Sequence, residues 1–182
     1  MGVGSTLSQR ARLIFFWALE ETNFIVTGLT ACTILYTRSS AIVYFALGAV
    51  VCSRVVKLMK KVLRQPRPVN PLPGHQKGDY GMPSTHSGVI SYYAAYSILA
   101  CKYLPIHSSL PDTPLTRVLA LLVIIPWAAT IAISRIWLGH HTWQQVTVGC
   151  SLGIMFTPIW FLLWTRVAHV YGEQLEQAIL GP

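Results

Sequence analysis

Residues 80–88 read Tyr-Gly-Met-Pro-Ser-Thr-His-Ser-Gly and stand at the start of an apolar segment of helical length. Two further motifs flank this stretch in the chain. A cationic run before it closes on Lys-x6-Arg-Pro at residues 60–68, and Ser-Arg-x5-His follows another apolar segment at residues 134–141. Basic residues and histidines at the ends of apolar helices indicate an anionic substrate at a membrane surface.

The composition also indicates a membrane protein. The chain has 182 residues, which predicts one membrane-embedded domain over residues 1–182. Of these residues 53% are apolar and 11% are charged, whereas soluble domains carry roughly 25% charged residues. The net charge of +8 fits anionic lipid. The sequence argues against nucleic-acid binding, because the basic residues are interleaved with apolar stretches of spanning length.

The apolar segments predict an all-α fold, a polytopic transmembrane helical bundle with about five spanning helices. A short segment at residues 167–180 is expected to form an interfacial helix or a loose tail. Residues 65–81 are rich in Pro and Gly and are expected to form an irregular connector. The helices are expected at residues 24–36 (short for a membrane span), 41–64, 86–104, 115–135 and 141–164.

Three residues mark expected features of these helices. Ser40 is the expected N-cap of the second helix. Pro126 is expected to bend or locally break the fourth, and Pro158 to kink the fifth.

The order of the helices places the three motifs on one face of the membrane. The first two motifs lie between the second and third expected helices, and the last motif follows the fourth. Two crossings separate these loops, so they lie on the same side. Basic residues also occur near the opposite face, so the positive-inside rule does not decide the orientation. They are Arg38, Lys102, Arg117 and Arg166.

In this order and topology, the three motifs resemble the tripartite signature of the type 2 phosphatidic acid phosphatase superfamily, which are membrane lipid phosphatases related to vanadium haloperoxidases. Residues 80–87 and the His-Thr-Trp-x-Gln-Val of residues 141–146 are most similar to the dolichyldiphosphatase branch. The resemblance spans roughly residues 40–155. It implies hydrolysis of dolichyl diphosphate to dolichyl phosphate in the endoplasmic reticulum membrane, with a lumen-facing site, in support of lipid-carrier recycling for protein N-glycosylation.

Two residues depart from the general superfamily pattern. Thr85 stands where Gly is usual, and Gln145 stands where an Asp is usual, four residues after the last histidine. Both departures resemble the dolichyldiphosphatase branch. We therefore interpret them as subfamily markers rather than as signs of an inactive enzyme.

The cationic motif residues suit a phosphate group. Arg67 and Arg135 each offer a planar fork of donors to phosphate oxygens, and Lys60 adds a point charge. Ser84, Thr85 and backbone N–H groups at the start of the third helix are expected to complete the phosphate cradle.

The two motif histidines suit the chemical steps. His141 is the expected nucleophile, giving a covalent phosphohistidine, and must be neutral to attack. His86 is the expected general acid for the leaving oxygen and later the base that activates water. Gln145, one helical turn after His141, is the expected partner of its ring.

Neighbouring residues have plainer interpretations. His140 and Gln144 repeat the spacing of His141 and Gln145, but the distance from Arg135 and the Thr-Trp that follows favour His141. Lys57, Lys61 and Arg64 are expected only to solvate a helix end or touch lipid headgroups.

No metal site and no cofactor are expected. Asp79 is the only carboxylate near either motif histidine, and the cations occupy the role that a divalent ion would take.

The sequence therefore predicts a metal-independent lipid diphosphate phosphatase, whose partners are the lipid diphosphate substrate and the membrane. The alternatives are a phosphatase of phosphatidate or another lipid phosphate, a bacterial undecaprenyl diphosphatase, and a catalytically silent lipid-binding protein. No oligomeric state is predicted.

Overall fold

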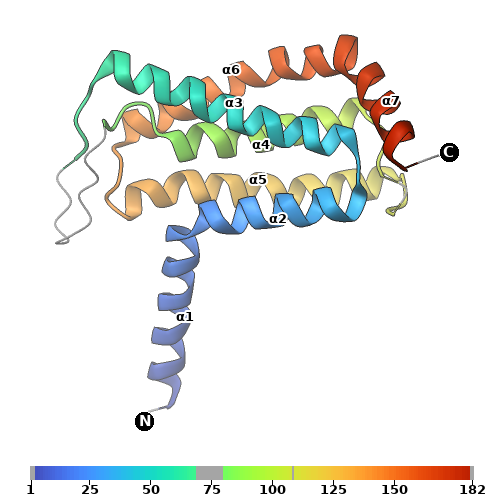
Figure 1. Ribbon diagram of the computed structural model, residues 1–182. Helices are drawn as coiled ribbons and strands as arrows, with labels where there is room; N and C mark the ends of the chain where they lie inside the picture. Colours follow the sequence, from blue (N-terminus) through green and yellow to red (C-terminus); the bar gives the residue numbers. More distant parts are fainter. Residues whose placement is uncertain (1–2, 69–79, 108, 181–182) are drawn as a thin grey trace.

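The computed structural model describes residues 3–68, 80–107 and 109–180. All regular structure in these ranges is helical, which confirms the all-α class (Figure 1). The expected connector at 65–81 is non-helical in its described parts, and its central residues 69–79 lie outside the described ranges. In chain order the helices are α1 (Val3–Glu20), α2 (Thr22–Thr37), α3 (Ser40–Leu63), α4 (Thr85–Tyr103), α5 (Pro114–Trp137), α6 (Trp143–Leu163), a π-helical turn (Trp164–Ala168) and α7 (His169–Leu180).

Within the described residues, three helical stretches are long and apolar enough to cross a membrane. They are Ser40–Leu63, Pro114–Trp137 and the continuous run Trp143–Ile179. The helix α4 is less apolar because it is enclosed by α3, α5 and α6 and meets little of the surrounding medium (Figure 1). α2, with 16 residues, is shorter than the ~20 needed for a straight crossing.

Close backbone contact between α4 and α6 fixes the motif end of the bundle. A Cβ atom on Gly153 would lie 2.0 Å from the carbonyl oxygen of Gly88, and one on Gly149 would lie 2.5 Å from that of Ser84. Only residues without a side chain allow the two helices to approach this closely. The start of α4 is thereby held against the first turns of α6.

The three motifs lie at one end of the bundle, where α3 ends, α4 begins and α5 turns into α6 (Figure 1). α1 leaves this same end at a steep angle to the other helices and carries an exposed apolar run at residues 13–17. α7 lies at the opposite end and packs on α3. It is a helix, so residues 169–180 are not a loose tail.

Two details differ from the sequence expectation. Ser39, with extended backbone, is the N-cap of α3, whereas Ser40 is its first helical residue. α5 and α6 run through Pro126 and Pro158 without interruption, so of the two outcomes expected at Pro126, a bend or a local break, the break does not occur. The Thr130 hydroxyl donates to the Pro126 carbonyl oxygen at 2.8 Å, adding a hydrogen bond within α5 near the proline.

Candidate active site

A cavity of about 290 Å³ lies at the motif end, between α2, α3, α4 and α5. All three motifs contribute to its wall. The predicted site residues that line it are Lys60, Arg67, Thr85, His86 and His141. The other lining residues are Thr22, Asn23, Val26, Ser53, Lys57, Val89, Ile90 and Ile131. The fold thus brings predicted site residues that are up to 81 positions apart in the chain, from Lys60 to His141, into one cavity.

The cavity is cationic. Lys57, Lys60 and Arg67 line it, and its described lining includes no Asp or Glu. Lys60 is only 6% exposed, so its charge acts where water screens it weakly. Such a wall attracts a group with several negative charges, as a phosphate or diphosphate has.

His141 sits in the short loop between α5 and α6. The backbone N–H groups of His140 and His141 both donate to the carbonyl oxygen of Arg135, at 3.0 and 3.1 Å. This loop is therefore tied to the end of α5. Burial, and next the nearby Arg67 guanidinium, lower the pKa of His141 to about 4. The ring is neutral at physiological pH, as a nucleophile must be.

The carboxamide of Gln145 holds the His141 ring. Its Nε2 donates to the Pro66 carbonyl oxygen at 3.0 Å and to Oε1 of Gln65 at 3.2 Å. Its Oε1 accepts the Thr142 N–H at 3.3 Å and lies 3.1 Å from Nδ1 of His141. A backbone carbonyl only accepts and a backbone N–H only donates, so these contacts fix which end of the carboxamide faces the ring.

Gly81 packs directly against this carboxamide. A Cβ atom on Gly81 would lie 2.5 Å from Nε2 of Gln145. The Gly81 N–H also donates to the Gln65 carbonyl oxygen at 2.7 Å. The motif at residues 80–88 therefore contacts the Gln145 carboxamide, which in turn contacts the His141 ring.

Arg67 lies on the other side of the His141 ring. Its Nη1 is 3.3 Å from Nε2 of His141 and donates to the carbonyl oxygen of His140 at 3.3 Å. A guanidinium has no acceptor, so Nε2 of His141 bears the lone pair and Nδ1 bears the proton. The nitrogen that faces the cation-lined cavity is therefore the nucleophilic one.

Of the predicted site residues at the start of α4, Thr85 and His86 line the cavity and Ser84 does not. The Ser84 side chain is fully buried and caps the helix, accepting from the Ser87 N–H at 3.4 Å and from its hydroxyl at 2.8 Å. It does not line the cavity. Thr85 and His86, the first two helical residues, do line it. Ser84 here positions α4, and its N–H donates to the Gln145 carbonyl oxygen at 2.9 Å.

Arg135 is also outside the cavity lining. It is only 2% exposed, and its guanidinium donates to the Ser134 hydroxyl and to the carbonyl oxygen of Leu19, at the end of α1. In this arrangement Arg135 ties the α1–α2 junction to α5. Its carbonyl oxygen supports the His141 loop, as described above.

Sequence reasoning missed four polar residues of the cavity, which are Thr22, Asn23, Ser53 and Lys57. Thr22 and Asn23 come from the start of α2, outside all three motifs, and no signal in the sequence points to them. Lys57 was expected only to solvate a helix end. It lies one turn before Lys60 on the same face of α3, and that spacing could have identified it.

The described residues contain no group of three or more His, Cys, Asp and Glu side chains that could hold a metal ion. Asp79, the carboxylate considered in the sequence, lies outside the described residues.

Known proteins with similar sequences are named as dolichyldiphosphatases and lipid phosphate phosphatases. The chain is 31% identical over 148 residues to Dolichyldiphosphatase 1 of Mus musculus, covering 79% of this chain and 61% of that protein. It is 26% identical over 168 residues to Lipid phosphate phosphatase gamma of Arabidopsis thaliana, covering 91% of this chain and 72% of that protein. The chain therefore spans only about three fifths of the mouse protein.

The fold is also similar to a solved structure, a transmembrane PAP2-type phosphatidylglycerolphosphate phosphatase from Bacillus subtilis. The TM-score is 0.61 and the identity is 19%, over 81% of this chain and 71% of that chain. This likeness supports a helical membrane bundle. The chain is an integral membrane protein, and because the family model of the PAP2 superfamily matches residues 39–168, it belongs to that superfamily.

Proposed function

We propose that the protein is a lipid phosphatase that hydrolyses a lipid-linked diphosphate, with dolichyl diphosphate as substrate and dolichyl phosphate and phosphate as products. The observation that carries the proposal is the His141 ring. Its proton is held on Nδ1 by Gln145, and its Nε2 lone pair faces a cavity lined by Lys60, Arg67 and His86.

In the first step, Nε2 of His141 attacks the terminal phosphorus atom. The bond between that phosphorus and the bridging oxygen breaks, and protonated His86 gives its proton to the departing lipid phosphate. The Lys60 and Arg67 cations stabilise the charge on the nonbridging oxygens. The Arg67 contact with Nε2 is replaced by a contact with the phosphate.

In the second step, His86 accepts a proton from water, and the resulting hydroxide attacks the phosphohistidine. The nitrogen–phosphorus bond breaks and free phosphate leaves, which restores both histidines. Thr85 and backbone N–H groups of α4 are the proposed additional phosphate ligands. Arg135 and Ser84 also stay proposed ligands, but each must first exchange its present contact for phosphate.

A diphosphate substrate is supported by Gln145 and by the cationic wall. Gln145 can orient His141 but brings no negative charge to stabilise the ring as it becomes positive. A nucleophile of this kind suits a good leaving group, and a phosphate monoester is a far better one than an alkoxide. By the likeness to the dolichyldiphosphatases, we propose the endoplasmic reticulum membrane as the location, with the cavity facing the lumen.

The test is phosphate release by the purified full chain with polyprenyl diphosphate, polyprenyl monophosphate and phosphatidate as separate substrates. The diphosphate is expected to give the highest kcat/KM. Preference for phosphatidate would favour the second candidate, a general lipid phosphate phosphatase, to which the likeness to Lipid phosphate phosphatase gamma points. When the polyprenyl diphosphate is supplied in both its dolichyl and its undecaprenyl form, preference for the undecaprenyl form would indicate the bacterial lipid carrier. If phosphate is released from none of the three substrates, the remaining candidate is a lipid-binding protein without catalytic activity.

A further inference from the structure

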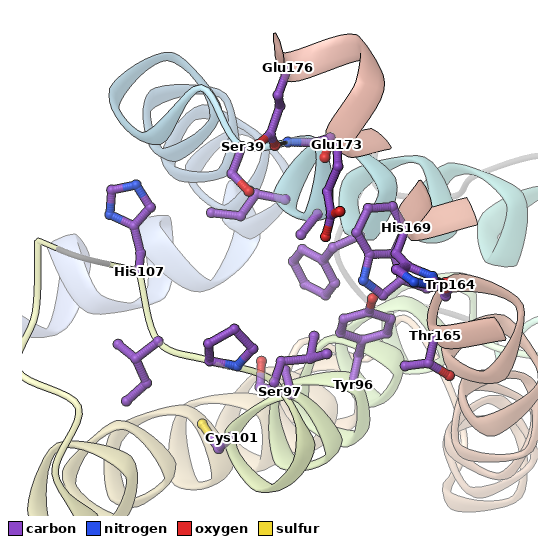
Figure 2. Close-up of a pocket in the computed structure, with 18 residues that line it drawn as sticks. Ser39, Tyr96, Ser97, Cys101, His107, Trp164, Thr165, His169, Glu173 and Glu176 are labelled. Carbon is purple, nitrogen blue, oxygen red and sulfur yellow. Dashed lines mark hydrogen bonds between the residues drawn. The ribbon is translucent and has the colours of Figure 1, made fainter. Parts of the chain in front are cut away.

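A second cavity, of about 640 Å³, lies at the end of the bundle opposite the active site (Figure 2). It is enclosed by the first turns of α3, the last turns of α4 with the connector that follows, and the region from Trp164 through α7. It shares no lining residue with the catalytic cavity. The size is within the range of pockets that bind small organic molecules, roughly 300–1,000 Å³.

Most of the cavity wall is apolar. Aliphatic and aromatic side chains from three regions contribute, including Ile42, Phe45, Ala100, Leu104 and Trp164. Tyr96 lines the cavity about two helical turns before the end of α4, so the cavity extends well into the bundle. A hydrocarbon chain would find there the surroundings that it has in a bilayer.

The Tyr96 hydroxyl lacks a partner. The side chain is only 3% exposed, and within the described part of the chain its oxygen is the one buried side-chain polar atom without a hydrogen bond. Figure 2 shows this hydroxyl directed from α4 into the cavity, on the side of Trp164. A buried polar group is unfavourable unless it is bonded, so the position is suited to a ligand that supplies the partner.

The polar side of the cavity is acidic. Glu173 and Glu176 line it, and its described lining includes no Lys or Arg. Glu176 accepts the N–H of Ser40 and so caps α3, while also bordering a separate groove that contains Arg38. The Glu173 carboxylate extends from α7 into the cavity (Figure 2). Two of the six acidic residues of a chain with net charge +8 therefore meet at this one place.

Two histidines, His107 and His169, also line the cavity. Nδ1 of His169 lies 3.3 Å from the carbonyl oxygen of Trp164, which only accepts, so Nδ1 donates in this contact. Nδ1 of His107 accepts the Ser109 N–H at 3.3 Å.

We propose that this cavity is a second lipid site, which binds a single-chain amphiphile with an ammonium head. The aliphatic chain lies against Phe45, Leu104 and Trp164. The ammonium group donates to the Glu173 carboxylate and to the Tyr96 hydroxyl. An amphiphile with a carboxylate or phosphate head is disfavoured, because it would face the two carboxylates without a lysine or arginine to neutralise it.

The test uses the purified full chain in lipid nanodiscs and four photoreactive probes. Each probe has the same diazirine-bearing sixteen-carbon chain, and the heads are primary ammonium, hydroxyl, carboxylate and phosphocholine. Mass spectrometry of the labelled peptides is expected to place the ammonium probe on residues 96–107 and 164–176. Its labelling there should exceed that of the carboxylate probe by about tenfold, which is the effect of one charge-assisted hydrogen bond.

Two variants separate binding from folding. Glu173→Gln should lower labelling by the ammonium probe about tenfold and leave the hydroxyl probe unchanged. Tyr96→Phe should lower ammonium labelling about threefold without lowering the melting temperature, because the hydroxyl that it removes has no partner in the protein. Tyr103→Phe, an exposed tyrosine on the same helix, is the matched control and should change nothing.

Equal labelling by all four probes, or ammonium labelling that Glu173→Gln does not lower, would overturn the proposal. Strongest labelling by the phosphocholine probe would also overturn it and would assign the cavity to a zwitterionic phospholipid. None of these outcomes depends on whether the catalytic cavity cleaves a diphosphate.

Discussion

Oε1 of Gln145 lies 3.1 Å from Nδ1 of His141, and the other end of the same carboxamide is held by the carbonyl oxygen of Pro66. A neutral side chain therefore does for this ring what a carboxylate could also do, which is to fix the tautomer. What it omits is the negative charge that would stabilise the imidazole as it becomes positive.

Replacing His141 by Ala should abolish turnover, with kcat lower by at least about 10³-fold, because the nucleophile is removed. Replacing His140 by Ala should leave most of the activity. The His140 ring does not line the cavity, and its backbone contacts with Arg135 and Arg67 survive the change. The measurement is phosphate release from diphosphate substrate by both variants at equal amounts of folded protein.

The covalent intermediate gives an independent check of that assignment. Acid-quenched enzyme, mixed briefly with substrate labelled in the terminal phosphate, should carry label in the His140 variant and none in the His141 variant. The opposite distribution would assign the nucleophile to His140.

The acid limb of the pH profile of log kcat/KM should lie at a lower pH than the usual pKa of histidine. Burial and the Arg67 guanidinium lower the pKa of His141 to about 4, so acidification should protonate the nucleophile only near that pH. Arg67→Gln removes a nearby positive charge and makes protonation easier. The limb of log kcat/KM should therefore shift to higher pH in this variant, whatever its overall rate.

The substrate ionises identically for wild type and Arg67→Gln, so a shift between the two profiles belongs to the enzyme. If the acid limb of the variant stays at the wild-type pH or moves to lower pH, Arg67 does not lower the pKa of His141.

Activity should persist in excess chelator. Lys57, Lys60 and Arg67 supply positive charge to the cavity through side chains, and these do not depend on a bound ion. The assay compares initial rates before and after dialysis against EDTA, followed by additions of Mg²⁺, Mn²⁺ or Zn²⁺. If activity is lost on dialysis and one of these ions restores it, the prediction is wrong.

The sequence predicts which motif residues meet in the cavity, because it shows how far each of them lies from the end of an apolar helix. Lys60 is in the last turn of α3, His86 is in the first turn of α4, and His141 precedes α6 by two residues. The apolar segments define those ends to within a few residues. Ser39 and Ser40 show the remaining uncertainty, since either serine can cap a helix and only the backbone conformation decides between them.

The surroundings of Arg135 could not be predicted, because they depend on a segment without a motif. The chain turns sharply at Glu21, with neither Gly nor Pro to mark the place, and α1 then leaves the bundle. This turn brings the Leu19 carbonyl oxygen to Arg135 and Asn23 to the cavity. The contact between Leu19 and Arg135 spans 116 positions in the chain, and local patterns carry no information about such tertiary arrangements.

Gln145→Asp should improve turnover of a lipid monophosphate relative to a diphosphate. A carboxylate at this position can stabilise the positive charge that develops on His141, and this matters most for the poorer leaving group. A charge effect of ~1–2 kcal/mol corresponds to a shift of roughly tenfold in the ratio of the two kcat/KM values. Asp is also one carbon shorter than Gln and loses the donors to Gln65 and Pro66, so overall activity is expected to fall.

Gln145→Asn is the control for that loss of length, because Asn is as short as Asp but neutral. The ratio of monophosphate to diphosphate kcat/KM should therefore be higher in the Asp variant than in both the Asn variant and the wild type, at one pH and in one detergent. The same ratio in the Asp and Asn variants would mean that charge at this position does not tune leaving-group preference. Gln145 would then act on His141 through its geometry alone, as a positioning residue whose amide connects the ring to Pro66.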